Sequence, residues 1–305
     1  MLEGFQHWLQ DPPPRLIFEV TETGVSLARL GTKSRLPEAV AFAPLAAGVL
    51  EASPVKENLH QPEGLDQALA EVLQQAAPVG KRKDAALLLP DNCARLAVLE
   101  FETLPGDARE RLTLIRWRLK KSVPFDADTA ALSCQVQRSA AGSKNLSVLV
   151  AVSPVEVIGQ YEAALRRAGL HPGYVSVAVA AALNLVEESG VTMLAKFSGR
   201  ALSLAVLQEG QVRLVRSLET GPAGEGLTED RLREMAADLY PTFVYVADNL
   251  GAPVSRLVLA GFDGAFDLAR EVFRRELGSE AEPLKGPQGV LEPHQAGIWG
   301  FLRAN

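Results

Sequence analysis

The chain has 305 residues, of which 47% are hydrophobic and 22% are charged, and its formal net charge is −6. This is the composition of a globular protein long enough for about two domains, and it leaves no basic surplus for binding a nucleic-acid backbone. No run approaches the ~20 apolar residues that span a bilayer. Cys93 and Cys134 are too few for a disulfide framework; paired or reduced thiols both fit, and a reducing cytosol is the simpler interpretation.

The first ten residues predict a short apolar helix, because Leu2, Phe5, Trp8 and Leu9 recur at helical spacing before the prolines at 12–14. The segment lacks the basic start of a secretory signal. A helix packed on the domain, or a disordered end, is favoured over a membrane-touching helix, since no Lys or Arg is present.

Strand and helix patterns then follow one another through the first half. The alternation of Leu16, Phe18 and Val20 predicts a strand that turns at residues 21–24 into a second strand ending at residue 30. The next predicted elements are a helix at 64–76, strands at 85–90 and 95–102, a helix at 107–122, an antiparallel strand pair at 132–137 and 146–152 with its loop at 139–144, and a helix at 154–168.

The same order of patterns begins again near Gly190. Glu209 and Gly210 form a predicted tight turn between two strands, and Pro241 is expected to kink or split a long helix. The predicted elements are strands at 193–197, 201–208 and 211–218, a helix at 228–249, a strand at 257–260 and helices at 266–277 and 294–303. The repetition predicts an α/β fold with a duplicated core.

Hairpin, strand and helix, followed by the same order again, resembles the actin-like ATPase superfamily, in which two ribonuclease-H-like domains face a cleft. The middle of the chain resembles the PilM family of type IV pilus assembly proteins. The matching residues are Leu87-Leu88-Leu89-Pro90, Leu104-Pro105, Ile115-Arg116-Trp117 and Val123-Pro124-Phe125, which are similar to the family's strand, L-P, helix with I-R-W, then I-P-F.

That resemblance implies a division into domains. Residues 15–91 and 171–189 would form the first actin-like domain after an N-terminal extension at 1–14. A small α+β subdomain at 92–170 would be inserted into it. Residues 190–285 would form the second actin-like domain, and residues 286–305 would return to the first.

The first hairpin departs from the family's phosphate-binding sequence, D-I-G-S-S-S-V-K. At the matching positions, 19–26, the acid is Glu19, the flexible glycine is Thr21, and Ser26 replaces the lysine. Glu22 would place a carboxylate where phosphates lie, which is repulsive at low dielectric.

The second hairpin and the adenosine motif depart as well. Lys196 replaces the second acid, and two hydroxyls are lost. Phe262 interrupts a T-G-G-G-like sequence at 260–264, where its ring would be pushed toward the nucleotide base unless its rotamer turns away. The degenerate ATP-site positions are Glu19, Thr21, Thr23, Gly24, Ser198, Gly199, Gly261 and Gly264. We therefore expect a pseudo-ATPase without catalytic residues or a resident metal, and ATP with Mg²⁺ only if the site is retained.

The charge exchange at Lys196 suggests a specific contact. The fold's two hairpin acids share a hydrated cation, so an ion pair between Glu19 and Lys196 would replace that cation; the alternative is that both side chains extend into water. His7, His60, His171 and His294 are scattered without the spacing of a metal site or a catalytic triad.

The resemblance also implies a location and partners. It implies a cytoplasmic protein, peripheral to the inner membrane, that holds the N-terminal peptide of a PilN-like membrane protein in a groove between the first domain and the inserted subdomain. PilO-like proteins and pilus motor ATPases would be indirect partners. Candidate partner-binding residues are Arg116, Trp117, Pro124 and Phe125. The basic residues of 109–121 are typical of a solvated helix face, with an acidic partner or anionic lipid as alternatives.

Two other functions compete with a scaffold. One is an active actin-like ATPase or a sugar-kinase relative. Aspartates at positions 19 and 196 and glycines at positions 21 and 198 would have favoured it, but these positions hold Glu19, Lys196, Thr21 and Ser198. The other is a nucleotide-binding relative from type II secretion or cell division. A GspL-type protein is expected to continue into a transmembrane helix and periplasmic domain, and an FtsA-type protein to end in an amphipathic helix longer than residues 299–303.

Overall fold

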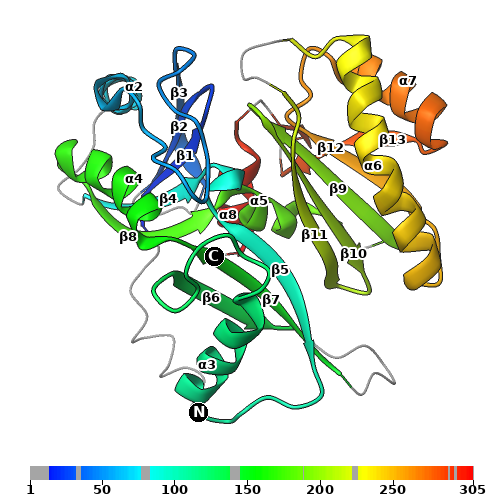
Figure 1. Cartoon of the computed structure of the whole chain (residues 1–305). Helices are drawn as coiled ribbons and strands as arrows, with labels where there is room; N and C mark the ends of the chain where they lie inside the picture. Colours follow the sequence, from blue (N-terminus) through cyan, green and yellow to red (C-terminus); the bar gives the residue numbers. More distant parts are fainter. Residues whose placement is uncertain are drawn as a thin grey trace.

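The structure is a computed structural model that describes residues 14–31, 36–76, 83–137, 145–187, 189–221, 226–287, 289–291 and 294–304. Two five-stranded sheets form the two halves of the molecule, and a three-stranded sheet lies below the first half (Figure 1). The predicted N-terminal helix and the loop at 139–144 lie outside the described residues.

The first half is built on the sheet order β3-β2-β1-β4-β8. Strands β1 (Leu16–Thr21), β2 (Gly24–Leu30) and β3 (Pro37–Pro44) are antiparallel neighbours. Strand β1 then pairs in parallel with β4 (Asp84–Leu89), and β4 with β8 (His171–Val177).

Helices cover both faces of this sheet, which explains why every residue of β1 is buried. Helices α2 (Pro62–Gln75) and α4 (Val155–Arg167) pack on the face that carries Phe18. Helices α5 (Ala178–Ala182) and α8 (Ala296–Ala304) pack on the opposite face.

The second half repeats this arrangement with the order β11-β10-β9-β12-β13. Its strands are β9 (Val191–Ser198), β10 (Ala201–Gln208), β11 (Gln211–Glu219), β12 (Arg256–Ala260) and β13 (Ala281–Pro283).

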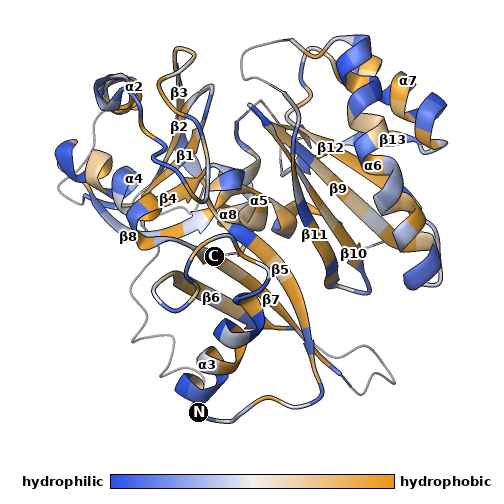
Figure 2. Ribbon diagram, viewed as in Figure 1, coloured by the Kyte–Doolittle hydropathy of each residue, from blue (hydrophilic) through white to orange (hydrophobic). Residues whose placement is uncertain are grey.

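Helices α6 (Glu229–Asn249) and α7 (Phe266–Leu277) cover one face of the second sheet. The other face shares an apolar cluster with α5 and α8, so these two helices lie between the halves. Figure 2 shows that the strands of both sheets are largely apolar. The equal strand orders confirm the predicted duplicated α/β core.

The third sheet has the order β5-β7-β6 and carries one helix. Strands β5 (Arg95–Phe101), β7 (Leu146–Ser153) and β6 (Ala131–Val136) form the sheet. Helix α3 (Ala108–Leu119) packs its buried residues against one face. The boundaries of the predicted domain division remain a prediction.

The strongly patterned elements were predicted to within a few residues. The unpredicted elements are the strands β3, β8 and β13, the short helix α5, the 3-10 turns Asp91–Cys93 and Leu183–Leu185, and the two-residue strands β14 (Lys285–Gly286) and β15 (Gly289–Val290).

The expectation that Pro241 splits its helix is wrong. Helix α6 continues through Pro241 over 21 residues. Both Pro241 and Ala237, whose carbonyl loses its helical partner, are exposed, so water can bind the freed oxygen. Among the described helices, none is both long and apolar enough to cross a bilayer.

Candidate functional site

The two predicted phosphate hairpins meet, and the Glu22 side chain joins them. Glu22 lies in the β1–β2 turn and is 6% exposed. Its Oε2 accepts a hydrogen bond of 2.9 Å from the backbone N–H of Arg200, in the turn between β9 and β10. Its Oε1 accepts one of 2.8 Å from the N–H of Ala52. One backbone donor of the second hairpin, the N–H of Arg200, is thus bound to a carboxylate of the chain itself.

The approach of the two turns is close. A Cβ on Gly199, which has φ of +62°, would lie 2.4 Å from Oε2 of Glu22, so a side chain there would displace the carboxylate. Burial raises the pKa of Glu22, while the Ala52 N–H and the Arg200 side chain partly oppose that shift.

The hydroxyl of Thr21 is also committed within its own turn. Thr21 Oγ1 donates to the carbonyl of Gly24 at 3.0 Å and accepts from the N–H of Gly24 at 3.1 Å. It lies 3.2 Å from Oγ1 of Thr23. Gly24 is required here because a Cβ would lie 2.4 Å from the Phe42 ring. The Thr21 hydroxyl is therefore engaged within the turn of the first hairpin.

Lys196 occupies the base of the cleft between the halves. It is 4% exposed, and its Nζ lies 2.9 Å from Oδ2 of Asp91 and 3.7 Å from Oε1 of Glu19. Burial by itself lowers the pKa of Lys196, but the carboxylates of Asp91 and Glu19 reverse that effect, so the pKa is raised. The predicted contact between Glu19 and Lys196 is confirmed, and the alternative that both side chains extend into water is wrong.

Asp91 is the member of this cluster that sequence reasoning missed. It follows β4 in a 3-10 turn, and its Oδ1 accepts a hydrogen bond of 2.8 Å from the N–H of Val179. The signal was an acid and an amide directly after a buried strand and Pro90. Asp91 makes the shorter ion pair with Lys196, and Glu19 makes the longer one.

Glu19 binds the start of the last helix in addition to facing Lys196. It is fully buried, and its Oε2 accepts a hydrogen bond of 3.1 Å from the N–H of Ile298. Its Oε1 has no hydrogen-bond partner among the described residues. Burial raises the pKa of Glu19, Lys196 lowers it and Asp91 raises it further.

Nearby, the His294 ring stacks on Phe42 with centroids 4.9 Å apart. Burial and then the charge of Lys196 lower the pKa of His294 to about 4, so this imidazole is neutral at pH 7. It adds no charge that could offset the three buried ionisable groups.

The Phe262 ring does not project toward the nucleotide position, contrary to the expectation from the sequence. It is 1% exposed and packs against Phe197 and Phe273, each with ring centroids 5.8 Å away. Gly261 permits this course because it has φ of +78°, and a Cβ there would lie 2.0 Å from the carbonyl oxygen of Phe197. Gly264, with φ of +63°, faces open space. Burial of an aromatic ring decides its rotamer.

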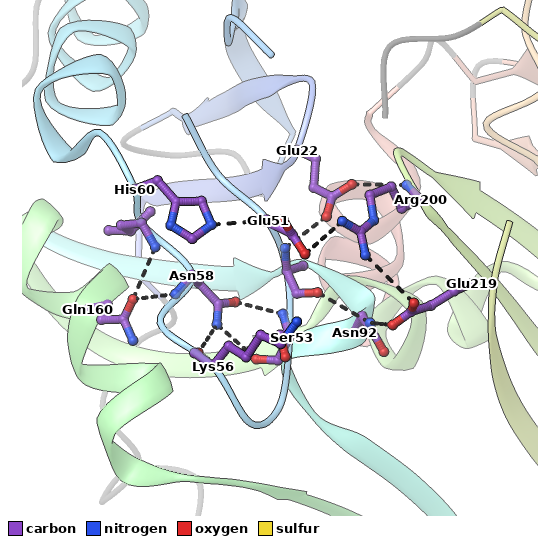
Figure 3. Close-up of polar contacts among 12 residues, drawn as sticks. Glu22, Glu51, Ser53, Lys56, Asn58, His60, Asn92, Gln160, Arg200 and Glu219 are labelled. Atoms are coloured by element: carbon purple, nitrogen blue, oxygen red, sulfur yellow. Dashed lines mark hydrogen bonds and ion pairs between the residues drawn. The ribbon is translucent and has the colours of Figure 1, made fainter. Parts of the chain in front are cut away.

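A second set of polar contacts joins the halves (Figure 3). The Arg200 guanidinium lies 2.7 Å from Oε1 of Glu51 and 3.6 Å from Oε2 of Glu219. Asn92 donates to the carbonyl of Ala52 at 3.2 Å and to Glu219 at 3.4 Å. The second half is thus linked to the loop after β3 and to the turn after β4.

Proteins with this fold generally bind ATP and Mg²⁺, so the residues of the cleft can be compared with what these ligands need. The ammonium group of Lys196 faces Glu19 and Asp91, where the fold's two hairpin acids would share a cation. The carboxylate of Glu22 binds the N–H of Arg200 in the second hairpin. Among the described residues, no group of three His, Cys, Asp or Glu is arranged to hold a metal ion. The side chains present do not fit the nucleotide and its cation.

An open groove of about 750 Å³ lies outside this cleft. It lies between β8, α4 and α8 on one side and the three-stranded sheet on the other. Apolar side chains dominate its lining, together with a few polar ones: Leu96, Leu132, Leu149, Val155, Ile158, Tyr174, Val177, Phe301, Ser133, Gln135 and Asn184.

The groove runs along the edges of two strands. Consecutive residues 131–135 of β6 and 174–177 of β8 line it, although successive side chains of a strand point to opposite faces. In the described part of the chain, β6 pairs only with β7, and β8 pairs only with β4. Each strand therefore presents an unpaired backbone edge to the groove.

The four predicted partner-binding residues do not line this groove. Arg116 points inward and donates to the carbonyls of Ala127 and Ala130. Trp117, on the same helix, is 64% exposed. Pro124 and Phe125 line a smaller pocket of about 570 Å³ beside residues 54–57. The structure separates the four residues into three environments.

No protein-family model and no curated protein matches this chain. Solved structures do. A chain of the PilM–PilN type IV pilus biogenesis complex superimposes with a TM-score of 0.78 at 19% identity, over 96% of this chain and 98% of that one. The cytoplasmic domain of EpsL, an inner membrane component of the type II secretion system of Vibrio cholerae, gives 0.52 at 13% identity, with 95% of each chain covered.

A protein of Bacteroides thetaiotaomicron with an actin-like ATPase fold gives a TM-score of 0.53 at 11% identity, with 94% of each chain covered. At such low identities the likeness establishes the fold and nothing more. With its duplicated five-stranded sheets and the inserted three-stranded sheet, the chain has the actin-like ATPase fold in the form found in the PilM–PilN complex.

Proposed function

We propose that this protein is a scaffold of a type IV pilus assembly platform that captures an extended peptide of a membrane-anchored partner and has lost nucleotide binding. The observation that carries the proposal is the apolar groove bounded by the free edges of β6 and β8. Backbone pairing at a strand edge, with apolar pockets for alternate side chains, is a general mode of peptide capture.

The walls of the groove suit such a peptide. The ring of Tyr174 is 42% exposed and meets the ring of Phe301 edge-on at 5.0 Å, which forms an aromatic wall. Val155, 53% exposed, lies at the start of α4 on the same groove. An extended peptide would cover these apolar groups and satisfy an unpaired strand edge at once.

The proposed partner is the N-terminal cytoplasmic peptide of a PilN-like membrane protein. The structural likeness to a chain of the PilM–PilN complex supports this choice. In that arrangement the protein is cytoplasmic and is held at the inner membrane by its partner, and PilO-like proteins and motor ATPases are reached indirectly.

Loss of nucleotide binding is the second half of the proposal. Lys196 and the Glu22 carboxylate occupy the positions that a cation and phosphates need, and both are bonded to several partners. ATP would have to displace buried, paired charges, and unpairing such charges costs several kcal/mol. The protein is therefore proposed to be no enzyme.

Peptide capture is tested with a synthetic peptide that covers the N-terminal cytoplasmic residues of a PilN-like membrane protein from the same organism. Gly159 lines the groove, and a Cβ there meets nothing within 4 Å, so Gly159→Trp would place an indole ring in the groove. We expect calorimetry to show binding to the wild type and a loss of at least about 100-fold in Gly159→Trp. Gly106→Trp, at another open glycine outside the groove, is the matched control.

The nucleotide half is tested separately by calorimetry with ATP and Mg²⁺. We expect no binding at micromolar concentrations. Micromolar binding to the wild type would contradict the proposed loss while leaving peptide capture untouched.

The EpsL likeness favours a second candidate, a scaffold of a type II secretion platform. The two candidates differ in the partner. Equal peptide titrations with the N-terminal cytoplasmic segments of a PilN-like and of a secretion-type membrane protein would distinguish them by which one binds.

A further inference from the structure

The helix that covers the third sheet concentrates positive charge in an otherwise acidic chain. Residues 109–121 contain six Arg or Lys against one acid, Glu110, whereas the whole chain has a net charge of −6. Helix α3 forms the lower end of the molecule, on the far side of the three-stranded sheet from the first half (Figure 1).

Part of this charge is used inside the subdomain. Arg116 is bonded to two carbonyl oxygens, and Lys120 lies 2.6 Å from Oδ2 of Asp128. Asp107 accepts hydrogen bonds from the first turn of the helix, and Asp126 binds the turn that follows. The carboxylates of Asp107 and Asp126 thus accept backbone hydrogen bonds, and the carboxylate of Asp128 pairs with Lys120.

Four cations remain without an ion pair among the described residues: Arg109, Arg111, Arg118 and Lys121. Arg118 lies over the Phe101 ring, with 5.8 Å to its centroid, and is exposed. Trp117 stands among them with 64% of its surface exposed, the largest exposed fraction of any aromatic side chain described. An unpaired aromatic ring surrounded by cations lies on the surface of this helix.

We infer that a surface formed by Arg109, Trp117 and Arg118 of α3 and by Lys121 in the turn after it contacts a membrane that contains anionic phospholipids. Anionic headgroups complement the unpaired cations, and Trp is favoured at the boundary between headgroups and acyl chains.

The geometry of this contact rests on the proposed function, because a peptide that continues into a membrane helix keeps its scaffold close to the bilayer. Peptide binding in the groove and lipid binding by the basic aromatic surface would then act together. Two weak interactions of the same protein are what stable peripheral attachment to a membrane requires.

The test is co-sedimentation of the full chain with vesicles of phosphatidylcholine alone and with roughly 30% phosphatidylglycerol. We expect binding only to the anionic vesicles, and its loss as salt rises from roughly 0.1 M to 0.5 M. Arg118→Glu/Lys121→Glu should weaken binding by at least about 25-fold, since each basic residue contributes roughly fivefold in affinity. Trp117→Ala should weaken it by roughly fivefold.

Matched controls separate this face from generic charge and aromaticity. Arg270→Glu/Arg274→Glu reverses two exposed arginines on α7 that have acidic neighbours, and Tyr240→Ala removes a 57% exposed ring on α6. Both should bind vesicles like the wild type, and thermal melts should be unchanged for all surface variants.

Failure of the wild type to bind anionic vesicles, or equal binding by the charge-reversal variant, would overturn the inference. An interaction of α3 with an acidic protein instead would appear as the first of these outcomes. Gly159→Trp should still bind vesicles, so loss of peptide capture and loss of membrane contact are distinguishable.

Discussion

The cleft between the halves and the groove beside the third sheet differ in whether their polar and apolar groups already have partners within the chain. In the cleft, Lys196, Asp91 and Glu22 are buried and bonded to one another or to backbone N–H groups. In the groove, two strand edges and the ring of Tyr174 face solvent. A ligand of the cleft would have to displace charges that are already paired, whereas a ligand of the groove would cover exposed apolar surface and pair with free strand edges.

Removing the central cation should give the largest effect. Lys196→Ala leaves Asp91 and Glu19 buried without their counter-charge, and we expect a loss of about 3–5 kcal/mol in the free energy of unfolding by urea titration. The control is Lys120→Ala, which breaks an exposed pair at 2.6 Å and should cost no more than about 1 kcal/mol. Equal losses in the two variants would show that the cleft is not held by its charges.

Removing the carboxylate between the hairpins should give an intermediate effect. Glu22→Ala leaves the N–H groups of Ala52 and Arg200 without their acceptor, so we expect a loss of about 2–3 kcal/mol. Glu22→Gln keeps an acceptor oxygen and should lose less. If instead Glu22→Ala bound ATP with Mg²⁺ by calorimetry, Glu22 alone would be blocking a functional site.

Trimming the aromatic wall should affect binding and not folding. Tyr174→Ala should weaken capture of the PilN-like peptide by about tenfold, with little change in Tm because the ring is 42% exposed. Tyr240→Ala, on α6, should change neither quantity. A large fall in Tm for Tyr174→Ala would mean that the groove wall is part of the core.

The smallest effect is a pH dependence from the cleft. The pKa of Glu22 is raised above 4.5, so its ionised form is disfavoured in the folded state. This penalty is full above the raised pKa and vanishes below 4.5. The stability of the wild type relative to Glu22→Gln should therefore rise as the pH is lowered from 7 toward 4.5, measured by paired thermal melts. A relative fall over that range would contradict the assigned cause.

Hydropathy periodicity and turn residues were enough to predict the duplicated α/β core. The alternation in residues 16–20 and the turn at Glu209-Gly210 predicted hairpins that the structure confirms. Short elements such as α5 were not predictable, because a segment of five residues, four of them buried, carries no period that separates a helix from a strand. Glu19 and Lys196 could be paired only because the resemblance placed both at one cleft.

The sequence by itself determined which residues are apolar, which turns need glycine and that the two hairpins carry charges unsuited to phosphate. Only the tertiary structure decided which partners those charged side chains have. Asp91, which follows β4, bonds to Lys196 of β9, although the two residues are 105 positions apart in the sequence. Glu22 accepts a hydrogen bond from Arg200 across 178 positions. The packing of the elements likewise buries the ring of Phe262 in the core and leaves the ring of Trp117 exposed. Local patterns set the elements, but pairings between distant charges and rings depend on how those elements pack.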